Sequence, residues 1–251
     1  MQTGKPYALN EQGRRSNNED AIFPQKNKAD KTNRFFLVCD GMGGHENGEV
    51  ASGSVCNSFA EFLKTVSPND FDEALFDRTL DFAFDELDQK DKATETERKM
   101  GTTLTFLYLN DKQVFMAHIG DSRIYHLRKN GKGKATILYK SSDHSLVGEL
   151  LKAEVITEEE AVNHPKKNII TRAMQPHLKK RCKADIHITQ DVQAGDFFFL
   201  CSDGVVESLT DDRLCAIAAE NDAKAMINAI GALCEKNSRD NYSAWLVPIV
   251  D

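Results

Sequence analysis

The chain has 251 residues, 40% of them hydrophobic and 28% charged, a composition typical of a soluble globular protein with a sizeable core. Its formal net charge of −7 argues against non-specific binding to nucleic acid, because a phosphate backbone is usually met by a basic surface. The N-terminal segment MQTGKPYALNEQG lacks the apolar stretch of a signal peptide, and no apolar run approaches the roughly 20 residues that span a bilayer. We therefore expect a cytoplasmic protein that binds neither nucleic acid nor membranes.

The six cysteines do not suggest a metal site or a disulfide framework. None of them forms a CxxC pair, and no histidine cluster accompanies them. Cys39 and Cys201 lie inside apolar runs, so they are expected to be reduced thiols in the core.

The first half of the chain is predicted to place two helices between groups of strands. Residues 48–66 carry apolar residues at helical spacing, and a second helix is predicted over residues 70–89. A Gly-Asp-Ser turn at 120–122 joins the last two strands of this half. Strands are predicted at residues 20–24, 34–39, 102–109, 114–119 and 123–127.

The second half begins with a polar segment, residues 143–170, which we interpret as a mobile flap. It contains a short helix, for which Thr157 and Glu160 have the spacing of a capping box. The chain has no repeat, low-complexity block or linker, so we expect one domain over residues 1–251. The remaining predicted elements are strands at 196–201 and 242–250 and helices at 211–220 and 223–236, the second capped by Asp222. Strand groups separated by helix pairs indicate an α+β fold with mostly antiparallel pairing.

Aspartates recur where predicted strands begin or end. FFLVCDG carries an apolar run into Asp40, and FFFLCSDGV carries another into Asp203. Asp240 lies just before the last strand, and Asp121 follows the strand at 114–119. Because the end of one antiparallel strand lies beside the start of its neighbour, we expect Asp40, Asp203 and Asp240 to meet on one rim, where Asp121 can join them.

Several carboxylates at one edge repel one another, which raises their pKa values or destabilises the fold. A divalent cation relieves this repulsion, and ligation by oxygen alone favours Mg²⁺ or Mn²⁺. Gly41 has no side chain and can turn its carbonyl toward a metal, while Gly43 and Gly44 allow water or substrate to approach the backbone. A single Asp-Gly pair is usually only a turn, so this prediction depends on the repetition of the pattern.

The chain resembles the metal-dependent protein phosphatases of the PPM (PP2C-like) family in their compact bacterial form. Eight blocks carry the resemblance in family order over nearly the whole chain: RSNNEDA (15–21), DGMGGH (40–45), GTT (101–103), GDSR (120–123), DHS (143–145), ITRA (170–173), SDG (202–204) and DN (240–241). The resemblance implies a four-layer α/β/β/α sandwich, in which two antiparallel β-sheets are flanked by helix pairs. Bacterial relatives often have glycine near Glu154.

The resemblance also implies roles for individual residues. Asp40 would bridge two metal ions, with the Gly41 carbonyl on one of them, and Asp203 and Asp240 would hold the other. The cofactors implied are two Mn²⁺ or Mg²⁺ ions, with a third in some bacterial relatives. The other implied roles are a third metal site for Asp121 with Asp203, contacts through metal-bound water for Glu19 and Asp20, and a grip on the substrate phosphate for Arg15.

The reaction implied is hydrolysis of phosphoserine and phosphothreonine by direct attack of a water that bridges the metals. The guanidinium of Arg15 suits two phosphate oxygens, although without the resemblance Arg15 beside Arg14 would pass for an exposed charge. Eukaryotic members carry a histidine where this chain has Met42. His45 and a metal-bound water are therefore both candidates for the general acid, and His45 is equally consistent with a loop histidine bonded to the backbone.

The leading hypothesis is a protein serine/threonine phosphatase that opposes a cytosolic Ser/Thr kinase. Its partners would be phosphorylated proteins and that kinase, and we expect a monomer. Two alternatives remain at this point: a pseudophosphatase that binds without catalysis, and a metal-dependent hydrolase of small phosphomonoesters. The presence of Asp40, Asp203 and Asp240 disfavours the first, and only flap contacts would separate the second from the leading hypothesis.

Overall fold

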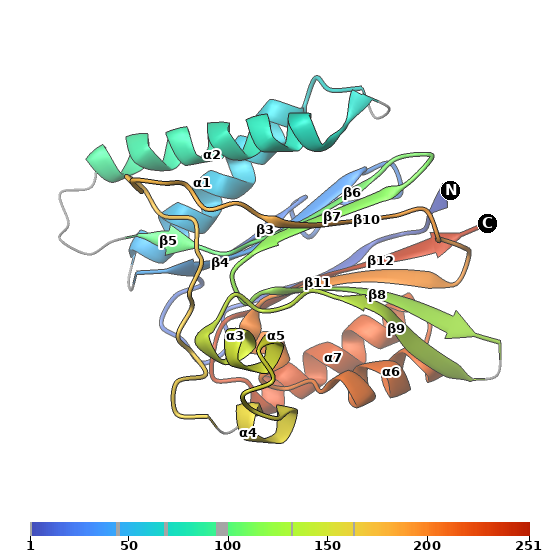
Figure 1. The fold of residues 1–251 in the computed structure, drawn as a ribbon. Coiled ribbons are helices and arrows are strands. Elements are labelled where there is room, and N and C mark those ends of the chain that lie inside the picture. Colours follow the sequence, from blue (N-terminus) through green and yellow to red (C-terminus); the bar gives the residue numbers. More distant parts are fainter. Residues whose placement is uncertain (1, 44–45, 68–69, 94–99, 132, 163) are drawn as a thin grey trace.

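The computed structural model describes residues 2–43, 46–67, 70–93, 100–131, 133–162 and 164–251. Within these residues the strands form two antiparallel sheets (Figure 1). One sheet has the strand order β1-β12-β11-β8-β9, with β2 also paired to β12. Its strands are β1 (Gln2–Thr3), β2 (Tyr7–Glu11), β8 (Arg123–Asn130), β9 (Lys134–Lys140), β11 (Asp196–Cys201) and β12 (Tyr242–Val250).

The second sheet has the strand order β10-β7-β6-β4-β3, with β5 paired to β4. Its strands are β3 (Asp20–Phe23), β4 (Phe35–Met42), β5 (Gly101–Thr102), β6 (Leu104–Leu109), β7 (Val114–Ile119) and β10 (Asp185–Thr189). The two sheets pack face to face, as Figure 1 shows.

Helix pairs cover the outer faces of the two sheets. The helices α1 (Glu46–Leu63) and α2 (Glu73–Ala93) pack on the sheet that contains β4, and α6 (Asp211–Glu220) and α7 (Ala223–Asn237) pack on the sheet that contains β11 (Figure 1). The predicted α/β/β/α sandwich is therefore confirmed. Three short helices complete the described elements: α3 (Leu146–Lys152), α4 (Glu158–Val162) and α5 (Asp203–Val206).

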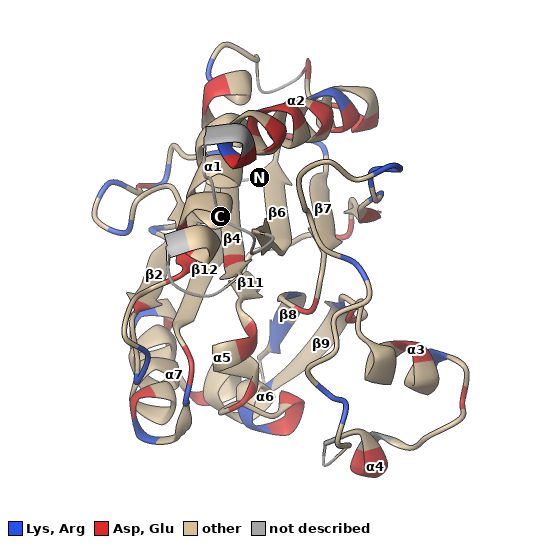
Figure 2. Ribbon diagram, turned by 90° about the vertical axis from the view of Figure 1, so that its left-hand side faces the viewer, with Lys and Arg blue, Asp and Glu red and all other residues tan. Residues whose placement is uncertain are grey.

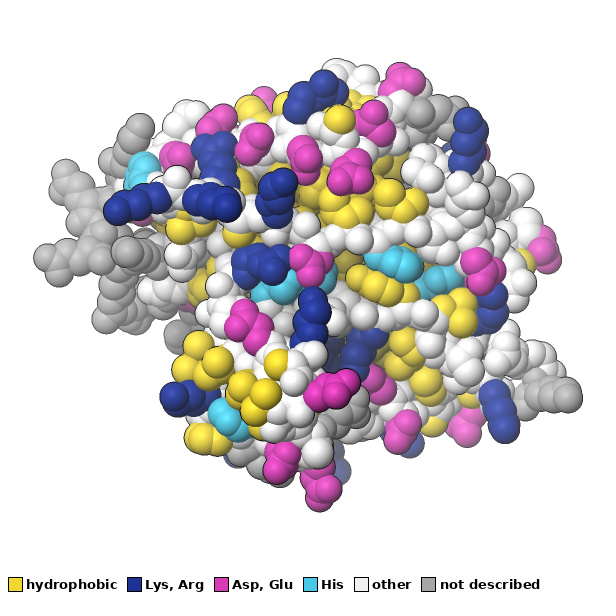
Figure 3. Space-filling model, viewed as in Figure 1, with side chains coloured by type: hydrophobic (Ala, Val, Ile, Leu, Met, Phe, Trp, Pro, Cys, Tyr) yellow, Lys and Arg dark blue, Asp and Glu magenta, His cyan; other side chains and the backbone are white. Residues whose placement is uncertain are grey.

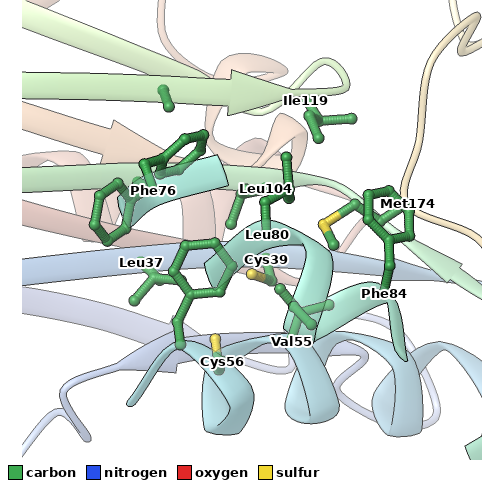
Figure 4. Packing of buried hydrophobic residues seen from close by; sticks show 14 of the residues in the cluster. Leu37, Cys39, Val55, Cys56, Phe76, Leu80, Phe84, Leu104, Ile119 and Met174 are labelled. Carbon is green, nitrogen blue, oxygen red and sulfur yellow. The ribbon is translucent and has the colours of Figure 1, made fainter. Parts of the chain in front are cut away.

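The apolar runs of the central strands fill two different cores. In β4, Leu37 and Cys39 pack against the α1/α2 layer, whereas Phe36 and Val38 pack between the sheets. Figure 4 shows the first of these cores, with Leu37 and Cys39 on the side of α1. Residues 197–201 alternate between two cores in the same way. A strand covered on both faces is apolar at every position, because successive side chains point to opposite faces.

Several local predictions are confirmed and others are wrong. Asp222 caps α7 by accepting a hydrogen bond from Ala225 N at 2.8 Å. The capping box of α4 is present, since Glu160 Oε2 accepts from Thr157 N at 2.8 Å and Thr157 Oγ1 accepts from Glu160 N at 3.3 Å. The predicted strand end at residue 39 is wrong, because β4 continues through Asp40 to Met42 by pairing with β5. The sequence did not predict β1, β2, β9, β10, α3 or α5.

Three further features agree with the sequence. All six cysteines are free, and Cys39 and Cys201 are buried. Glu154 has a φ of 56°, a conformation that favours glycine, which explains why a glycine suits this part of the flap. None of the helices in the described ranges has both the length and the apolar character needed to cross a membrane.

Candidate active site

Two carboxylates face each other at the rim between the sheets. Asp20 begins β3 and lies directly opposite Asp40 of β4 in the antiparallel register, so both side chains point to the same face. This is the face between the sheets, because Phe36 and Val38 point to it from the same strand. Asp20 is 8% exposed, and its Oδ2 accepts a hydrogen bond from Ser202 Oγ at 2.8 Å.

The backbone of Asp40 is held by the GTT block. Its N–H donates to Thr103 Oγ1 at 2.9 Å, and its carbonyl accepts from Thr103 N at 2.9 Å and from Thr102 Oγ1 at 3.0 Å. Thr103 Oγ1 also lies 2.7 Å from Ser122 Oγ, next to Asp121. The block therefore fixes the end of β4 and connects it to the turn that carries Asp121.

Asp203 and Asp240 come together from the other sheet. Asp203 is the first residue of α5 and is separated from the end of β11 by Ser202 alone, and Asp240 precedes β12, the strand that pairs with β11. A Cβ on Gly204 would lie 1.9 Å from Asn241 O and 3.3 Å from Asp240 Cβ. The glycine after Asp203 is therefore required, because the Asp240–Asn241 backbone packs against it. Figure 2 shows acidic residues, in red, near the end of β4 and at the start of α5.

The carboxylates of the two sheets share one electrostatic environment. Burial is the first cause of a raised pKa in each case: to about 7 for Asp20 and for Asp121, to about 6 for Asp203, and well above the ordinary value for Asp40. The negative charge of Asp203 raises the pKa of the other three, and the charge of Asp240 raises that of Asp203. Together these groups form one cluster, which we call the carboxylate cluster: Asp20, Asp40, Asp121, Asp203 and Asp240.

The carboxylate cluster fits a hard divalent cation. Within the described part of the chain, Asp121 Oδ1 is buried without a hydrogen-bond partner. Positive charge from Arg123 lowers the pKa of Asp121 and that of Arg15 lowers the pKa of Asp203, yet burial and the neighbouring carboxylates outweigh both. Mg²⁺ and Mn²⁺ prefer oxygen ligands, and they bind well where buried carboxylates carry more negative charge than the nearby cationic side chains balance.

Arg15 lies at the edge of the carboxylate cluster. Its Nη2 donates to Asp240 Oδ2 at 2.5 Å, and its side chain is 56% exposed. This ion pair was not expected, because the family resemblance implies that Arg15 binds phosphate and Asp240 binds a metal ion.

Packing explains why a glycine follows Asp40 in β4. A Cβ on Gly41 would lie 2.2 Å from Gly48 O and 2.5 Å from Glu19 O, so only glycine lets α1 and the Glu19 backbone approach β4 this closely. Gly41 N–H also donates to Glu19 O at 3.1 Å. The direction of its carbonyl toward a metal stays a prediction. His45 and Gly44 lie outside the described residues.

Comparisons with known proteins identify the family of the chain. A family model described as "Protein phosphatase 2C" matches residues 11–250. The chain belongs to the protein phosphatase 2C (PP2C) family. It is 35% identical over 203 residues to protein phosphatase PhpP of Streptococcus pneumoniae, which covers 80% of this chain and 78% of that protein. It is 30% identical over 239 residues to serine/threonine protein phosphatase PstP of Mycobacterium tuberculosis, which covers 94% of this chain and 43% of that protein.

Solved PP2C structures share the fold. The crystal structure of the M. tuberculosis phosphatase PstP aligns over 100% of both chains with a TM-score of 0.85 and 26% identity. The catalytic domain of PstP has been solved in complex with two manganese ions, and it aligns over 100% of both chains with a TM-score of 0.83 and 27% identity. The serine/threonine phosphatase Stp1 of Staphylococcus aureus aligns over 100% of this chain and 98% of its own, with a TM-score of 0.80 and 29% identity.

The PP2C block DN contains a residue whose importance the sequence analysis missed. Asn241 Nδ2 donates to Gln12 O at 2.7 Å and to Asn17 O at 2.8 Å, and its Oδ1 accepts from Glu19 N at 2.9 Å. The side-chain amide of Asn241 therefore closes the loop that carries Arg15 and holds the backbone N–H of Glu19. The sequence signal was the DN pair itself, which was interpreted only through its aspartate.

Replacing Asn241 with aspartate is expected to displace the loop that carries Arg15. A carboxylate cannot donate to Gln12 O and Asn17 O, so it replaces two hydrogen bonds by repulsion. We expect KM for a phosphopeptide to rise about tenfold, which corresponds to about 1.4 kcal/mol of substrate binding. Steady-state kinetics check this result. Asn130→Asp, at an exposed position at the end of β8, adds the same charge and should leave KM unchanged; equal effects of both variants would contradict the role of Asn241.

A second group of metal-ligand type lies beside the flap in this PP2C chain. His118, His144 and Asp185 bring three ligand atoms within 4.8 Å of one another. However, His144 Nδ1 accepts a hydrogen bond from Gly120 N–H at 3.1 Å, so the proton of the neutral ring is on Nε2, which faces Asp185 Oδ2 at 3.2 Å. Burial, with help from the His118 charge, lowers the pKa of His144 to about 4 and keeps the ring neutral. Nδ1 is therefore already hydrogen-bonded, whereas the buried Nε2 has no hydrogen bond of good geometry among the described residues and is the ring nitrogen of His144 left to bind an ion.

Proposed function

We propose that this chain is a Mn²⁺- or Mg²⁺-dependent protein serine/threonine phosphatase. The observation that carries the proposal is the carboxylate cluster, in which burial and mutual repulsion raise the pKa values of four aspartates at the rim between the sheets. Membership of the PP2C family and the two manganese ions in the PstP complex support the same interpretation.

We assign the ligands to residues of the cluster. Asp40 would bridge two ions, with the Gly41 carbonyl on one of them and Asp203 and Asp240 on the other. Asp121, with Asp203, would hold a third. Asp20 and Glu19 would act through metal-bound water. The carboxylate of Asp20 is hydrogen-bonded to Ser202, and the backbone N–H of Glu19 is hydrogen-bonded to Asn241.

The ions, when bound, would supply positive charge to the phosphoryl group and an activated water for direct attack on phosphorus. The chain's own residues position the substrate around them. Arg15 would bind two phosphoryl oxygens and neutralise the charge that develops on them. The threonines of the GTT block would keep Asp40 in place, because they hold its N–H and its carbonyl. His45 and a metal-bound water both remain candidates for protonating the leaving oxygen.

Arg15→Ala is expected mainly to raise KM. The guanidinium contributes charge-assisted hydrogen bonds to the bound phosphate, and losing them should weaken phosphopeptide binding about tenfold or more. Arg15→Lys keeps the charge without the planar fork and should give an intermediate KM. Initial-rate kinetics with a phosphothreonine peptide measure both. If KM and kcat are unchanged in the alanine variant, Arg15 does not contact the substrate.

One assay tests the proposed function against its alternatives. The purified protein is given para-nitrophenyl phosphate, a phosphothreonine peptide or a panel of phosphorylated metabolites, with Mn²⁺ or with chelator. We expect metal-dependent hydrolysis of the peptide. Binding of Mn²⁺ without turnover of any substrate would indicate a pseudophosphatase, and rapid hydrolysis of metabolites with the peptide ignored would indicate a small-molecule hydrolase.

We further propose that the chain acts as one PP2C-like domain and as a monomer on phosphorylated proteins, and that it opposes a Ser/Thr kinase. The names of its relatives, which include serine/threonine phosphatases of Listeria and Mycobacterium, support the substrate class. Comparison of protein phosphorylation in cells with and without the gene would identify the substrates: Ser/Thr phosphorylation should rise in its absence.

A further inference from the structure

The first two residues of the flap hold the turn that carries Asp121. Gly120 and His144 exchange two hydrogen bonds, from Gly120 N–H to His144 Nδ1 at 3.1 Å and from His144 N–H to Gly120 O at 2.9 Å. On the other side of Asp121, the Arg123 Nε and Nη2 donate to the two carboxylate oxygens of Asp143 at 2.7 and 2.8 Å. Asp121 therefore lies between two contacts that both come from the flap.

Outside the flap, the turn is also contacted by Thr103, whose Oγ1 lies 2.7 Å from Ser122 Oγ. Asp121 is 9% exposed, and among the described residues its Oδ1 has no hydrogen-bond partner. The preceding Gly120 has a φ of +103°, and a Cβ there would lie 2.6 Å from Thr103 Cγ2. The direction of the Asp121 carboxylate thus depends on the backbone of this turn and on what holds it.

His144 is itself fixed from its other side. Its ring stacks on His118, with centroids 4.4 Å apart and planes inclined by 16°, and its Nε2 faces Asp185 Oδ2 at 3.2 Å. Asp185 Oδ1 in turn accepts from Arg172 Nη1, at the far end of the flap. Figure 3 shows histidine (cyan), basic (dark blue) and acidic (magenta) side chains close together on one face of the molecule.

The two ends of the flap are also joined to each other. Leu146 N–H donates to Ile169 O at 2.9 Å, and Thr171 N–H donates to His144 O at 2.8 Å. His144 therefore lies at the base of the flap and contacts both the His118–Asp185 group and the turn that precedes Asp121.

We propose that His144 is a positioning residue: by accepting the Gly120 N–H at Nδ1 it aims Asp121 at the metal centre and couples the base of the flap to that centre. The proposal rests on the proposed function only in taking Asp121 as a metal ligand. Residues that orient metal ligands typically change metal affinity by 10- to 100-fold when they are replaced.

Two substitutions isolate the Nδ1 contact. His144→Asn keeps an acceptor where Nδ1 lies, whereas His144→Gln loses that acceptor but retains most of the side-chain volume and reaches toward Asp185. His187→Gln is the matched control, since His187 lies on β10 and stacks on Tyr139 at 3.9 Å, away from the turn. Thermal unfolding of the three variants first establishes that each one folds.

The first readout is amide hydrogen exchange of the Gly120 turn in the metal-free protein, and the second is Mn²⁺ binding by calorimetry. We expect His144→Gln to speed exchange of the Gly120 amide about fivefold or more and to weaken binding of the ion held by Asp121 about tenfold. His144→Asn and His187→Gln should resemble the unsubstituted protein in both readouts.

The proposal is overturned if His144→Gln exchanges and binds Mn²⁺ like the unsubstituted protein, or if His144→Asn is impaired as strongly as His144→Gln. Asp121→Asn separates this outcome from failure of the proposed ligand set. If Asp121→Asn leaves Mn²⁺ binding unchanged, Asp121 is not a ligand and the coupling to the metal centre is wrong with it, whatever the turn exchange shows. Absence of phosphatase activity, by contrast, would contradict only the proposed function, because neither readout requires turnover.

Discussion

Asp203→Asn is expected to reduce kcat by at least about 10²–10³-fold. Asp203 raises the pKa of Asp20, Asp40 and Asp121, so it lies at the electrostatic centre of the carboxylate cluster. The proposed metal assignments use it for more than one ion. An amide removes its charge and one anionic ligand while nearly preserving its shape, and hydrolysis of a phosphothreonine peptide under saturating Mn²⁺ measures the loss.

The matched control for this prediction is Asp111→Asn. Its side chain is 61% exposed and pairs only loosely with Arg34 at 3.6 Å, so kcat should be unchanged. Activity of Asp203→Asn within about tenfold of the unsubstituted protein would remove Asp203 from the catalytic machinery.

Asp203→Asn is also expected to stabilise the metal-free protein at pH 7.5. The pKa of Asp203 is raised to about 6 in the folded state from an ordinary value of 3.8, first by burial and then by the charge of Asp240. The folded state therefore binds more protons than the unfolded chain between about pH 4 and pH 6, and stability is lost as the pH rises through that window. Without the Asp203 carboxylate this loss of stability does not occur. The free energy of unfolding of the variant at pH 7.5 should therefore be higher by about 1–3 kcal/mol.

Thermal or urea unfolding of both proteins at pH 5 and pH 7.5, in chelator, measures this effect. The difference between the two proteins is the informative quantity, since burial lowers the pKa values of His118 and His144 and gives the whole protein an opposite slope in the acid range. Mn²⁺ should reverse the order at pH 7.5 by stabilising only the protein with Asp203. An asparagine variant less stable than the original in chelator at pH 7.5 would show that the cluster is not under repulsion.

The layered fold was predictable because its central strands are covered on both faces. The runs at 35–39 and 197–201 are apolar at every position for that reason, and α1, α2, α6 and α7 show the spacing of one buried face. The edge strands β9 and β10 were missed because they are only partly buried and carry no continuous apolar run. Asp40 was predicted to follow its strand, but pairing with β5, which is distant in sequence, extends β4 past it.

The carboxylates of the site were predictable, whereas the residues that hold them were not. Asp40, Asp121, Asp203 and Asp240 lie next to the apolar runs of predicted strands, a pattern visible in the sequence, and the family resemblance supplied Arg15. Asn241 and His144 act through bonds to backbone groups at residues 12, 17 and 120. No local pattern encodes such contacts, because they depend on how distant loops meet. The Arg15–Asp240 ion pair was missed for the same reason.

The central claim is that aspartates from both sheets hold divalent ions at the rim between them. The most direct measurement is anomalous diffraction at the manganese edge from crystals of the protein grown with Mn²⁺. We predict anomalous peaks within bonding distance of the carboxylates of Asp40, Asp203 and Asp240. Peaks confined to other places, such as the His118–His144–Asp185 group, with these three carboxylates free of metal, would contradict the account.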